Sequence, residues 1–281
     1  MSARHILALS CPDRPGIVAA VTGLLAERGD NITDAQQYGD PVTERFFLRV
    51  VFDSPDPAGF EAGFAALAER FGMEWTLRAQ AQRPRVLILV SKFDHCLVDL
   101  IYRTRLGEIP MEIAGVVSNH PRAAIGVSNL HGAEFTHIPV TRATKPEAEA
   151  RLREVIADSR ADYVVLARYM QILSDGLSRE LMGRCVNIHH SFLPGFKGAR
   201  PYHQAHRRGV KMIGATAHFV TPDLDEGPII AQGVEPISHR DTPETMVAHG
   251  RSIEQRVLAR AVKALVEDRV FLNGERTVVF S

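Results

Sequence analysis

Two stretches in the C-terminal half of the chain contain polar residues of types that can carry out chemistry. Asn187 and His189 follow a short apolar run that begins at Cys185, and Asp225 lies in an acidic turn further along the chain. The two-residue period of a strand places Asn187 and His189 on one face, at the C-terminal end where open α/β sheets bind ligands. An asparagine N–H can stabilise an oxyanion, a histidine can carry a proton, and a carboxylate can orient water.

Each of these residues also has a non-catalytic interpretation. Asn187 could end a strand, the adjacent His189 and His190 could be packed or solvated, and residues 225–227 would make a good hairpin turn. A zinc hydrolase using both histidines, His218 and Asp225 is a sharper alternative, but the sequence has no H-E-x-x-H motif or compact ligand spacing. We therefore expect no metal and no cofactor.

Strands and helices alternate in the region that must position these residues. The expected strands are 85–90, 112–117, 135–138, 163–166 and 185–188, and the expected helices are 94–105, one that starts with a capping box at Thr144, and 243–265. A hairpin over residues 214–230 should extend the sheet. This alternation predicts a Rossmann-like, mostly parallel sheet covered on both faces.

The first strand-to-helix turn of this region excludes common nucleotide sites. It reads V-S-K-F-D-H over residues 90–95 and contains no glycine. A dinucleotide-binding turn or a Walker loop needs glycines there, because the backbone N–H groups must approach a phosphate. Dinucleotide chemistry is therefore disfavoured.

The first 80 residues have a different order of elements. Apolar periodicity predicts strands at 6–9, from 32, at 44–52 and at 73–79. Helices should start in the turn at Pro15, with Val18 on the apolar face, and near Asp56. The order βαββαβ is typical of a ferredoxin-like domain. Because the polar segment 80–84 separates the two patterns, we expect domains at residues 1–82 and 83–281.

Composition restricts the partners of the chain. Its 281 residues contain 33 basic and 33 acidic side chains, so no cationic excess is present to attract nucleic acid. No apolar run approaches the length of a membrane span and no signal-peptide pattern opens the chain, so we expect a cytoplasmic protein without a membrane partner. Three scattered cysteines, Cys11, Cys96 and Cys185, should be reduced structural thiols.

The stretch S-C-P-D-R-P-G-I-V at residues 10–18, followed by Asn31 after the helix, resembles an ACT domain. Such domains usually pair and bind small effectors, often amino acids. The resemblance implies a homo-oligomer and an effector site that includes Asp13, Gly16 and Asn31. The alternative is that the turn only shapes and caps the helix start.

Two later stretches resemble the superfamily of N10-formyltetrahydrofolate hydrolases and transferases. They are N-I-H-H-S-F-L-P, from residue 187, and H-F-V-T-P-D-L-D-E-G-P-I-I, from residue 218. The resemblance implies a formyltransferase domain from Pro84 onward, with Asn187, His189 and Asp225 as the catalytic set. Supporting roles fall to Thr216 and His218, which would order a water and the aspartate turn, and to His190.

A third stretch, L-A-R-Y-M-Q-I-L at residues 166–173, resembles the loop that holds the pterin ring in this superfamily, with Gln171 where arginine is common. The implied folate-binding residues are Leu166, Met170, Gln171, Ile172, Leu173, Val220 and Leu224.

The superfamily transfers formyl to a ribonucleotide, to methionyl-tRNA or to water, and the sequence favours water. A glycine-rich first loop for the ribonucleotide phosphate is absent, and about 16 residues after helix 243–265 cannot form a tRNA-binding domain. His190, the loop with Lys197 and Arg200, and the ACT-like first half resemble the deformylases. Lys197 and Arg200 could instead be surface charges or bind the glutamate tail of folate.

We therefore expect hydrolysis of 10-formyltetrahydrofolate to tetrahydrofolate and formate, balancing the folate pool and supplying formate for purine synthesis. Transfer of formyl to an amine acceptor is the alternative reaction. A folate- or amino-acid-sensing protein with an inactive site is the alternative from another class, and the presence of all three implied catalytic residues argues against it.

Overall fold

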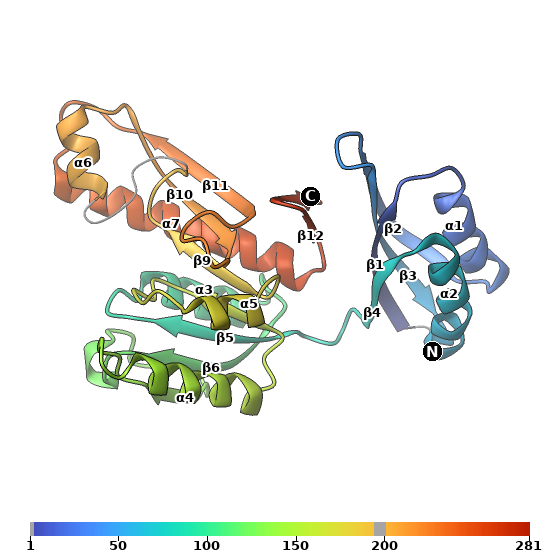
Figure 1. Cartoon of the computed structure of the whole chain (residues 1–281), viewed down its shortest axis with the longest axis horizontal. Coiled ribbons are helices and arrows are strands. Elements are labelled where there is room, and N and C mark those ends of the chain that lie inside the picture. The colour runs from blue at the N-terminus through green and yellow to red at the C-terminus, as the bar shows by residue number, and fades with distance from the viewer. Residues whose placement is uncertain (1–2, 194–200) are drawn as a thin grey trace. The chain divides into compact units, whose positions relative to one another are not determined.

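The computed structural model describes residues 3–193 and 201–281, so the predicted roles of Lys197 and Arg200 lie outside the described residues. The chain divides into two compact units (Figure 1). One unit comprises Met1–Arg83 together with Glu267–Ser281, and the other comprises Pro84–Val266.

The first unit contains an antiparallel sheet with the predicted order of elements. They are β1 (Ala3–Pro12), α1 (Ile17–Glu27), β2 (Asn31–Asp40), β3 (Arg45–Ser54), α2 (Pro57–Phe71) and β4 (Glu74–Ala79). The strands lie in the order β2-β3-β1-β4. Apolar side chains of β1 and β3 pack against α1 and α2. In α2 the rings of Phe60 and Phe64 stack on each other within this core. This is the ferredoxin-like arrangement that the sequence pattern predicts.

The start of α1 differs from the prediction. Gly16 is the N-cap at φ 94°, a left-handed conformation that glycine adopts without steric cost, and Pro15 therefore lies outside the helix. The buried face consists of Ile17, Val21 and Leu25, whereas Val18, expected on that face, is 38% exposed. The helix is thus rotated from the predicted register. No side-chain cap is formed at this helix, so Asp13 does not cap it.

The C-terminal segment belongs to the first unit, which differs from the expected boundary of 83–281. It forms a hairpin of β12 (Val270–Asn273) and β13 (Arg276–Val279), with Gly274 at φ 63° in the two-residue turn. Phe271 meets the ring of Phe47 on β3 with centroids 5.7 Å apart, and Asn273 donates to Asp40 at 2.5 Å. Apolar and polar burial together hold this segment on the sheet.

The second unit is built around a seven-stranded sheet with helices on both faces. Its elements are β5 (Arg85–Val90), α3 (His95–Arg105), β6 (Glu112–Ser118), a 3₁₀ turn (Arg122–Ala124), β7 (Phe135–His137), α4 (Lys145–Asp158), β8 (Tyr163–Leu166), α5 (Asp175–Glu180), β9 (Cys185–His189), α6 (Pro201–Arg208), β10 (Met212–Phe219), β11 (Ile229–Pro236) and α7 (Pro243–Val266). The strand order is β11-β10-β9-β8-β5-β6-β7. Strands β9 to β7 in that order are parallel, while β10 runs antiparallel to β9 and β11 antiparallel to β10.

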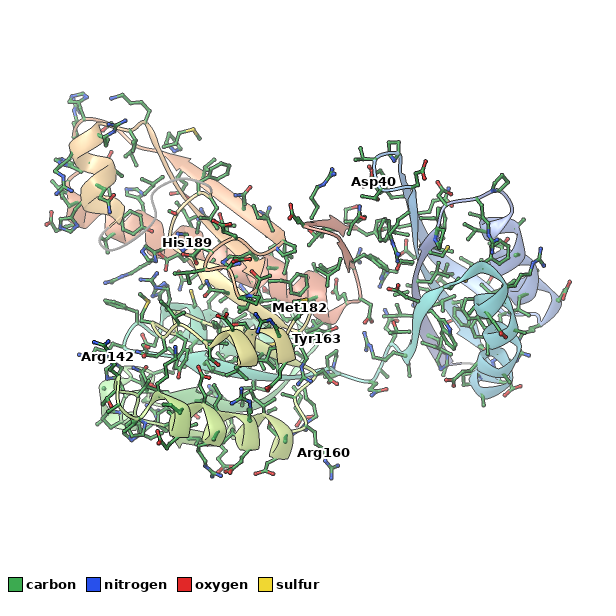
Figure 2. All side chains as sticks on the ribbon, viewed as in Figure 1. Asp40, Arg142, Arg160, Tyr163, Met182 and His189 are labelled. Carbon is green, nitrogen blue, oxygen red and sulfur yellow. The ribbon has the colours of Figure 1, made fainter. Side chains whose placement is uncertain are left out.

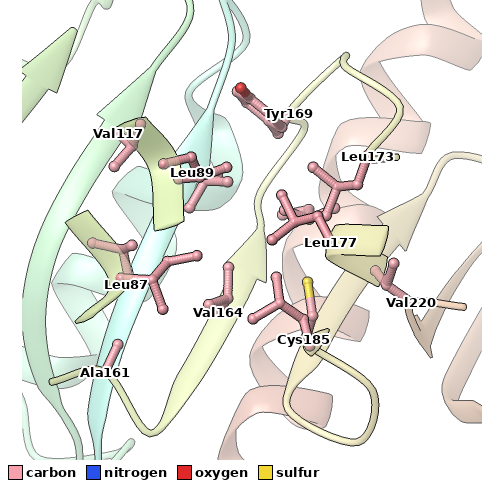
Figure 3. Packing of buried hydrophobic residues seen from close by; sticks show 14 of the residues in the cluster. Leu87, Leu89, Val117, Ala161, Val164, Tyr169, Leu173, Leu177, Cys185 and Val220 are labelled. Atoms are coloured by element: carbon pink, nitrogen blue, oxygen red, sulfur yellow. The ribbon is translucent and has the colours of Figure 1, made fainter. Parts of the chain in front are cut away.

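One face of this sheet packs on α4 and α5 through a continuous apolar core. Figure 3 shows part of that core, in which Leu87 and Leu89 of β5 meet side chains from β8, β9 and α5. Helices α3 and α7 contact each other, and α7 also packs on β9, β10 and β11. Because both faces are covered, the free space for a ligand lies at the C-terminal edge of the strands.

The capping box predicted at the start of α4 is absent. Thr144 is the N-cap residue, but its hydroxyl makes no capping hydrogen bond. It instead accepts from the Thr141 N–H at 3.0 Å and pairs with the Thr141 hydroxyl at 2.9 Å. The Thr144 hydroxyl therefore forms hydrogen bonds within a local turn instead of the helix cap that the sequence pattern predicted.

Among the described residues, none of the helices combines the length and apolar character needed to cross a membrane.

Candidate active site

The site begins where β9 and β10 run side by side. Their register pairs Asn187 with His218 and His189 with Thr216, and a bulge between Ala217 and His218 changes the pairing of β10 with β11. His189, labelled in Figure 2, is the last residue of β9. Asn187 and His189 both line one cavity, as the two-residue period of the strand predicted.

His189 and Asp225 form the central polar pair. His189 Nδ1 lies 3.2 Å from Asp225 Oδ1, and both side chains are largely buried. The other ring nitrogen, Nε2, is buried and has no hydrogen-bond partner among the described residues. Because Nδ1 is held by a carboxylate, Nε2 is the nitrogen left to exchange a proton with a ligand in the cavity.

The turn that carries Asp225 is tightly constrained. Asp225 has φ 59°, in the left-handed region that aspartate tolerates better than most residues. A Cβ on Gly227 would overlap the carbonyl oxygen of Phe219, so only glycine permits this return of the chain. The constrained turn fixes the carboxylate against His189.

His218 connects Asn187 to this pair. His218 Nδ1 lies 2.8 Å from the carbonyl oxygen of Phe219, which only accepts, so Nδ1 carries the proton. In the neutral ring Nε2 then accepts from Asn187 Nδ2 at 3.2 Å, and it lies 3.7 Å from Asp225 Oδ1. His218 thus holds one N–H of the Asn187 amide and leaves the second for a ligand.

The ionisation of the site follows from these contacts. Burial alone would raise the pKa of Asp225, but the hydrogen bond from His189 and the proximity of the His218 ring outweigh it and hold that pKa well below its usual range. Burial, followed by the charges of Arg168 and His189, lowers the pKa of His190 to about 4. At neutral pH the site therefore contains an ionised Asp225 and a neutral His190, whose ring stacks on His189 with centroids 5.1 Å apart.

The cavity has a volume of about 620 Å³ and a largely apolar wall. Its lining includes all seven residues predicted to bind folate, together with five of the six catalytic and supporting residues: Leu166, Met170, Gln171, Ile172, Leu173, Val220 and Leu224, with Asn187, His189, His190, His218 and Asp225. The exposed fractions of Met170, Ile172 and Leu224 are 53%, 61% and 56%, so this wall offers apolar surface to a flat ring.

Thr216 is placed differently from its predicted role. Its side chain is fully buried and does not line the cavity. The hydroxyl donates to the carbonyl oxygen of Ser191 and accepts from the Leu193 N–H, at 3.0 and 3.1 Å. It also accepts from Gln232 Nε2 at 3.1 Å. Thr216 therefore anchors the segment after β9, and these contacts give no support for its ordering the aspartate turn.

Beside the predicted catalytic residues lies a buried charged network that was not predicted from the sequence. Glu254 of α7 is 2% exposed, and its Oε2 lies 2.8 Å from His95 Nε2 and 3.3 Å from Arg168 Nε. Tyr202 donates to Glu254 Oε1 at 3.0 Å. Burial would raise the pKa of Glu254, but the His95 hydrogen bond and the Arg168 charge lower it overall. The sequence signal that could have indicated this network is Glu254 itself, a glutamate among the apolar positions of a long helix.

Arg168 in this network has an unusual backbone. Its φ is 65°, which costs a side chain with a Cβ about 1–2 kcal/mol. Its carbonyl oxygen accepts from the Ser91 N–H at 3.2 Å, which fixes the conformation. Strain of this kind tends to occur at functional sites.

Among the described residues, His95, Cys96 and Glu254 form the one group whose ligand atoms lie close enough to hold a metal ion. The Arg168 guanidinium next to Glu254 disfavours a second cation there. Burial also raises the pKa of the Cys96 thiol well above its usual value, which disfavours the thiolate that binds metals.

The three residues predicted to bind an effector lie in the first unit. Asp13 follows β1 and its N–H donates to the carbonyl oxygen of Glu44, Gly16 caps α1, and Asn31 opens β2. A Cβ on Gly39 would lie 2.7 Å from Asp13 Oδ2, so the Asp13 carboxylate lies close to the end of β2.

Comparisons with known proteins agree with both units. The formyl transferase family model matches residues 84–262, and the ACT domain model matches residues 5–68. A solved structure of glycinamide ribonucleotide transformylase 1 from Symbiobacterium toebii is 30% identical, covering 73% of this chain and 98% of its own, with a TM-score of 0.64. The sheet and the site at its edge therefore define a formyltransferase-type enzyme domain.

Relatives that match both units identify the family more narrowly. Formyltetrahydrofolate deformylases from Corynebacterium sp. (strain P-1) and Bacillus subtilis (strain 168) are 51% and 46% identical, with 98% of this chain and 98% and 93% of theirs covered. The solved structure of the Burkholderia mallei enzyme of that name is 53% identical over 99% of this chain and 100% of its own, with a TM-score of 0.95. The chain belongs to the formyltetrahydrofolate deformylase family.

Proposed function

We propose that this chain hydrolyses 10-formyltetrahydrofolate to tetrahydrofolate and formate, with Asn187, His189 and Asp225 as catalytic residues. The observation that carries this proposal is the arrangement of His189. Its Nδ1 is held by Asp225. Its buried Nε2 has no hydrogen-bond partner in the described part of the chain and belongs to a side chain that lines the cavity.

The apolar wall of the cavity would bind the pterin ring. The segment after β8 and the turn after β10 supply Met170, Ile172 and Leu224, which combine large exposed areas with a position on the cavity. A flat heterocycle buries such side chains and gains about 25 cal/mol for each Å² of apolar surface removed from water. Folate bound in this way would have its formyl group next to His189.

Hydrolysis forms one bond and breaks one bond at the formyl carbon. Asp225 accepts a hydrogen bond from a water molecule, and the water oxygen attacks the carbon. The free N–H of Asn187 donates to the developing oxyanion, an interaction worth about 3–4 kcal/mol in comparable sites. Protonated His189 then transfers its proton from Nε2 to N10 as the carbon–nitrogen bond breaks. Formate and tetrahydrofolate leave, and the proton released by the water restores the imidazolium.

The direct test compares formate release by three proteins in the absence of any acceptor. The wild-type chain should release formate and tetrahydrofolate in equal amounts. Asp225→Asn should lose about 10²–10⁴-fold in kcat, because it removes the carboxylate that orients water and stabilises the charged imidazole. Glu226→Gln, the neighbouring exposed acid, should retain activity. Formate release that needs an added amine would contradict the proposal.

The first unit would carry a regulatory site and hold copies of the chain together. The match to the ACT model, the turn at Asp13 and Gly16, and Asn31 at the start of β2 support an amino-acid effector. Screening amino acids against the full chain by thermal shift should identify a ligand whose effect is lost in Asn31→Ala. The absence of any shift across the set would contradict this part, and light scattering would measure the assembly.

The released formate would supply purine synthesis and balance the folate pool. The test is a deletion of the gene in its source organism: growth without purines should become dependent on formate. Unchanged growth without formate would contradict this role.

A further inference from the structure

The cavity has a second wall, which contains more polar side chains than the apolar one. It includes Phe93 after β5, Arg168 after β8, His190 after β9, and Tyr202 of α6. Two of these residues, Arg168 and Tyr202, contact Glu254, which is buried in α7. The second wall thus combines aromatic rings with Arg168, and a buried charged network lies behind it.

The geometry points to Arg168 as a specificity-determining residue: its guanidinium, held by Glu254, occupies the side of the cavity from which an amine acceptor would reach the formyl carbon. The inference rests on the proposed hydrolysis. Its consequence is that Arg168 restricts the reaction to water.

The first support is the rigidity of Arg168. Its backbone has φ 65° and is fixed by the Ser91 N–H, and its side chain is only 12% exposed. The guanidinium carbon lies 5.8 Å from the Phe93 ring centre, and Arg251 lies at 5.7 Å from the same ring. A side chain held from several directions keeps its volume in the cavity wall instead of moving aside for a ligand.

The second support is the construction of its anchor. Glu254 is 2% exposed and is held at both carboxylate oxygens, by Tyr202 at one and by His95 and Arg168 at the other. A Cβ at position 250 would overlap Tyr202 Oη, so Gly250 of α7 makes room for that hydroxyl. A buried carboxylate needs a cation nearby, and Arg168 supplies it.

The third support is the unused hydrogen-bonding capacity of the guanidinium. Arg168 Nε and Nη1 are buried and have no hydrogen-bond partner among the described residues, although Nε is in ion-pair contact with Glu254. Buried donors without partners favour a small hydrogen-bond acceptor such as water. The positive charge repels an amine, which is largely protonated at neutral pH.

The acceptor decides the products of the same bond cleavage. With water, an oxygen–carbon bond forms, the bond from carbon to N10 breaks, and N10 receives a proton. With an amine, a nitrogen–carbon bond forms instead, and the proton lost by the amine balances the proton given to N10. A transformylase from Symbiobacterium toebii shares this fold at a TM-score of 0.64, so the acceptor is chosen by side chains and not by the sheet.

The experiment measures how each protein divides the formyl group between two acceptors. 10-Formyltetrahydrofolate is incubated with excess glycinamide, and formate, N-formylglycinamide and tetrahydrofolate are quantified. The double variant Arg168→Gly, Glu254→Gln removes the guanidinium and also the buried charge that it balances. Glycine suits the positive φ, and glutamine keeps the hydrogen-bonding shape of Glu254.

The wild-type chain should give formate as by far the main product, which sets a small reference ratio of N-formylglycinamide to formate. The double variant should raise the ratio of N-formylglycinamide to formate at least about 10-fold, the result of a change near 1.4 kcal/mol in relative barriers. Arg168→Lys keeps a cation and should give an intermediate ratio. A merely structural role for Arg168 would change the rate of tetrahydrofolate formation but not this ratio.

Two outcomes overturn the inference and remain distinct from failure of the proposed function. An unchanged ratio in a double variant that still forms tetrahydrofolate contradicts the role of Arg168. If the double variant does not fold, Arg168→Lys takes its place, and a ratio equal to that of the wild-type chain in this variant also contradicts the inference. A wild-type chain that forms no formate contradicts the hydrolysis itself.

Discussion

Both units of this chain bury polar side chains, but they use them differently. In the first unit Arg49 and Asp40 are 2% and 5% exposed, and they bind the C-terminal segment through the carbonyl oxygen of Glu267 and the amide of Asn273. In the second unit His189 is 6% exposed and lines a cavity, and one of its ring nitrogens has no partner among the residues that the structure describes. Burial alone therefore does not distinguish the proposed catalytic histidine from structural polar side chains. A better indication of a catalytic role is a buried polar atom that has no hydrogen-bond partner and belongs to a side chain lining a cavity.

The largest expected effect separates two buried histidines, one from each unit. His189→Gln should reduce kcat by about 10³-fold, because it removes the proton donor. His5→Gln replaces a histidine that is 5% exposed and whose Nδ1 donates to the carbonyl oxygen of Ala3, and it should leave kcat unchanged. Steady-state assays of both variants decide the matter. Equal losses of kcat in the two variants would contradict the assignment of a catalytic role to His189 and a structural role to His5.

A second pair compares two asparagines. Asn187→Ala should lower kcat about 10²-fold by removing an oxyanion donor, with little change in KM. Asn273→Ala should instead destabilise the first unit by about 1–3 kcal/mol, because Asp40 loses a buried partner. Kinetics and hydrogen exchange on both variants measure the two effects. A loss of stability without a loss of kcat in Asn187→Ala would contradict its assigned role.

The C-terminal hairpin provides a prediction about stability alone. Phe271→Ala should weaken protection of the β3 amides by about 2–3 kcal/mol, since its ring packs edge-on to buried Phe47. Leu272→Ala, at a neighbouring side chain that is 42% exposed, should change protection by less than about 0.5 kcal/mol. Hydrogen exchange of the full chain compares them. Unchanged protection in Phe271→Ala would place the hairpin outside the stabilising core.

The smallest effect concerns pH and the second unit. The folded-state pKa of His190 is lowered to about 4 from about 6.5, so between those values the unfolded chain binds more protons and acid destabilises the fold. His190 should contribute a loss on the order of 1–2 kcal/mol between pH 7 and pH 5. Denaturant unfolding at both pH values should show a smaller difference in His190→Asn. If the stability difference between pH 7 and pH 5 is the same in His190→Asn, a group other than His190 causes the acid destabilisation.

The sequence predicted the fold of both halves well because the apolar periods were strong and the turns carried clear signals. The expected folate-binding residues all line the cavity: five lie at the end of β8 or in the segment after it, and two follow β10. The hairpin after α7 was not expected, although Asn273 and Gly274 between apolar runs are a recognised hairpin signal. Short terminal elements of this kind depend on the surface to which they bind.

Other features required the three-dimensional structure. Thr216 matches the family pattern, but its hydroxyl forms hydrogen bonds with the segment after β9. No sequence motif distinguishes this anchoring role from the predicted role of ordering the aspartate turn. The network of Glu254, His95 and Arg168 joins residues from α7, the start of α3 and the end of β8, which are far apart in the chain. Long-range pairing of single side chains leaves no periodic trace in a sequence.

The most direct test of the account uses isotopically labelled water. The purified chain is incubated with 10-formyltetrahydrofolate in H₂¹⁸O without any acceptor, and the formate is analysed by mass spectrometry. The account predicts that each formate carries one ¹⁸O atom, because water forms the new bond to carbon, and that Asp225→Asn produces such formate far more slowly. Unlabelled formate, or no formate until an amine is added, would contradict it.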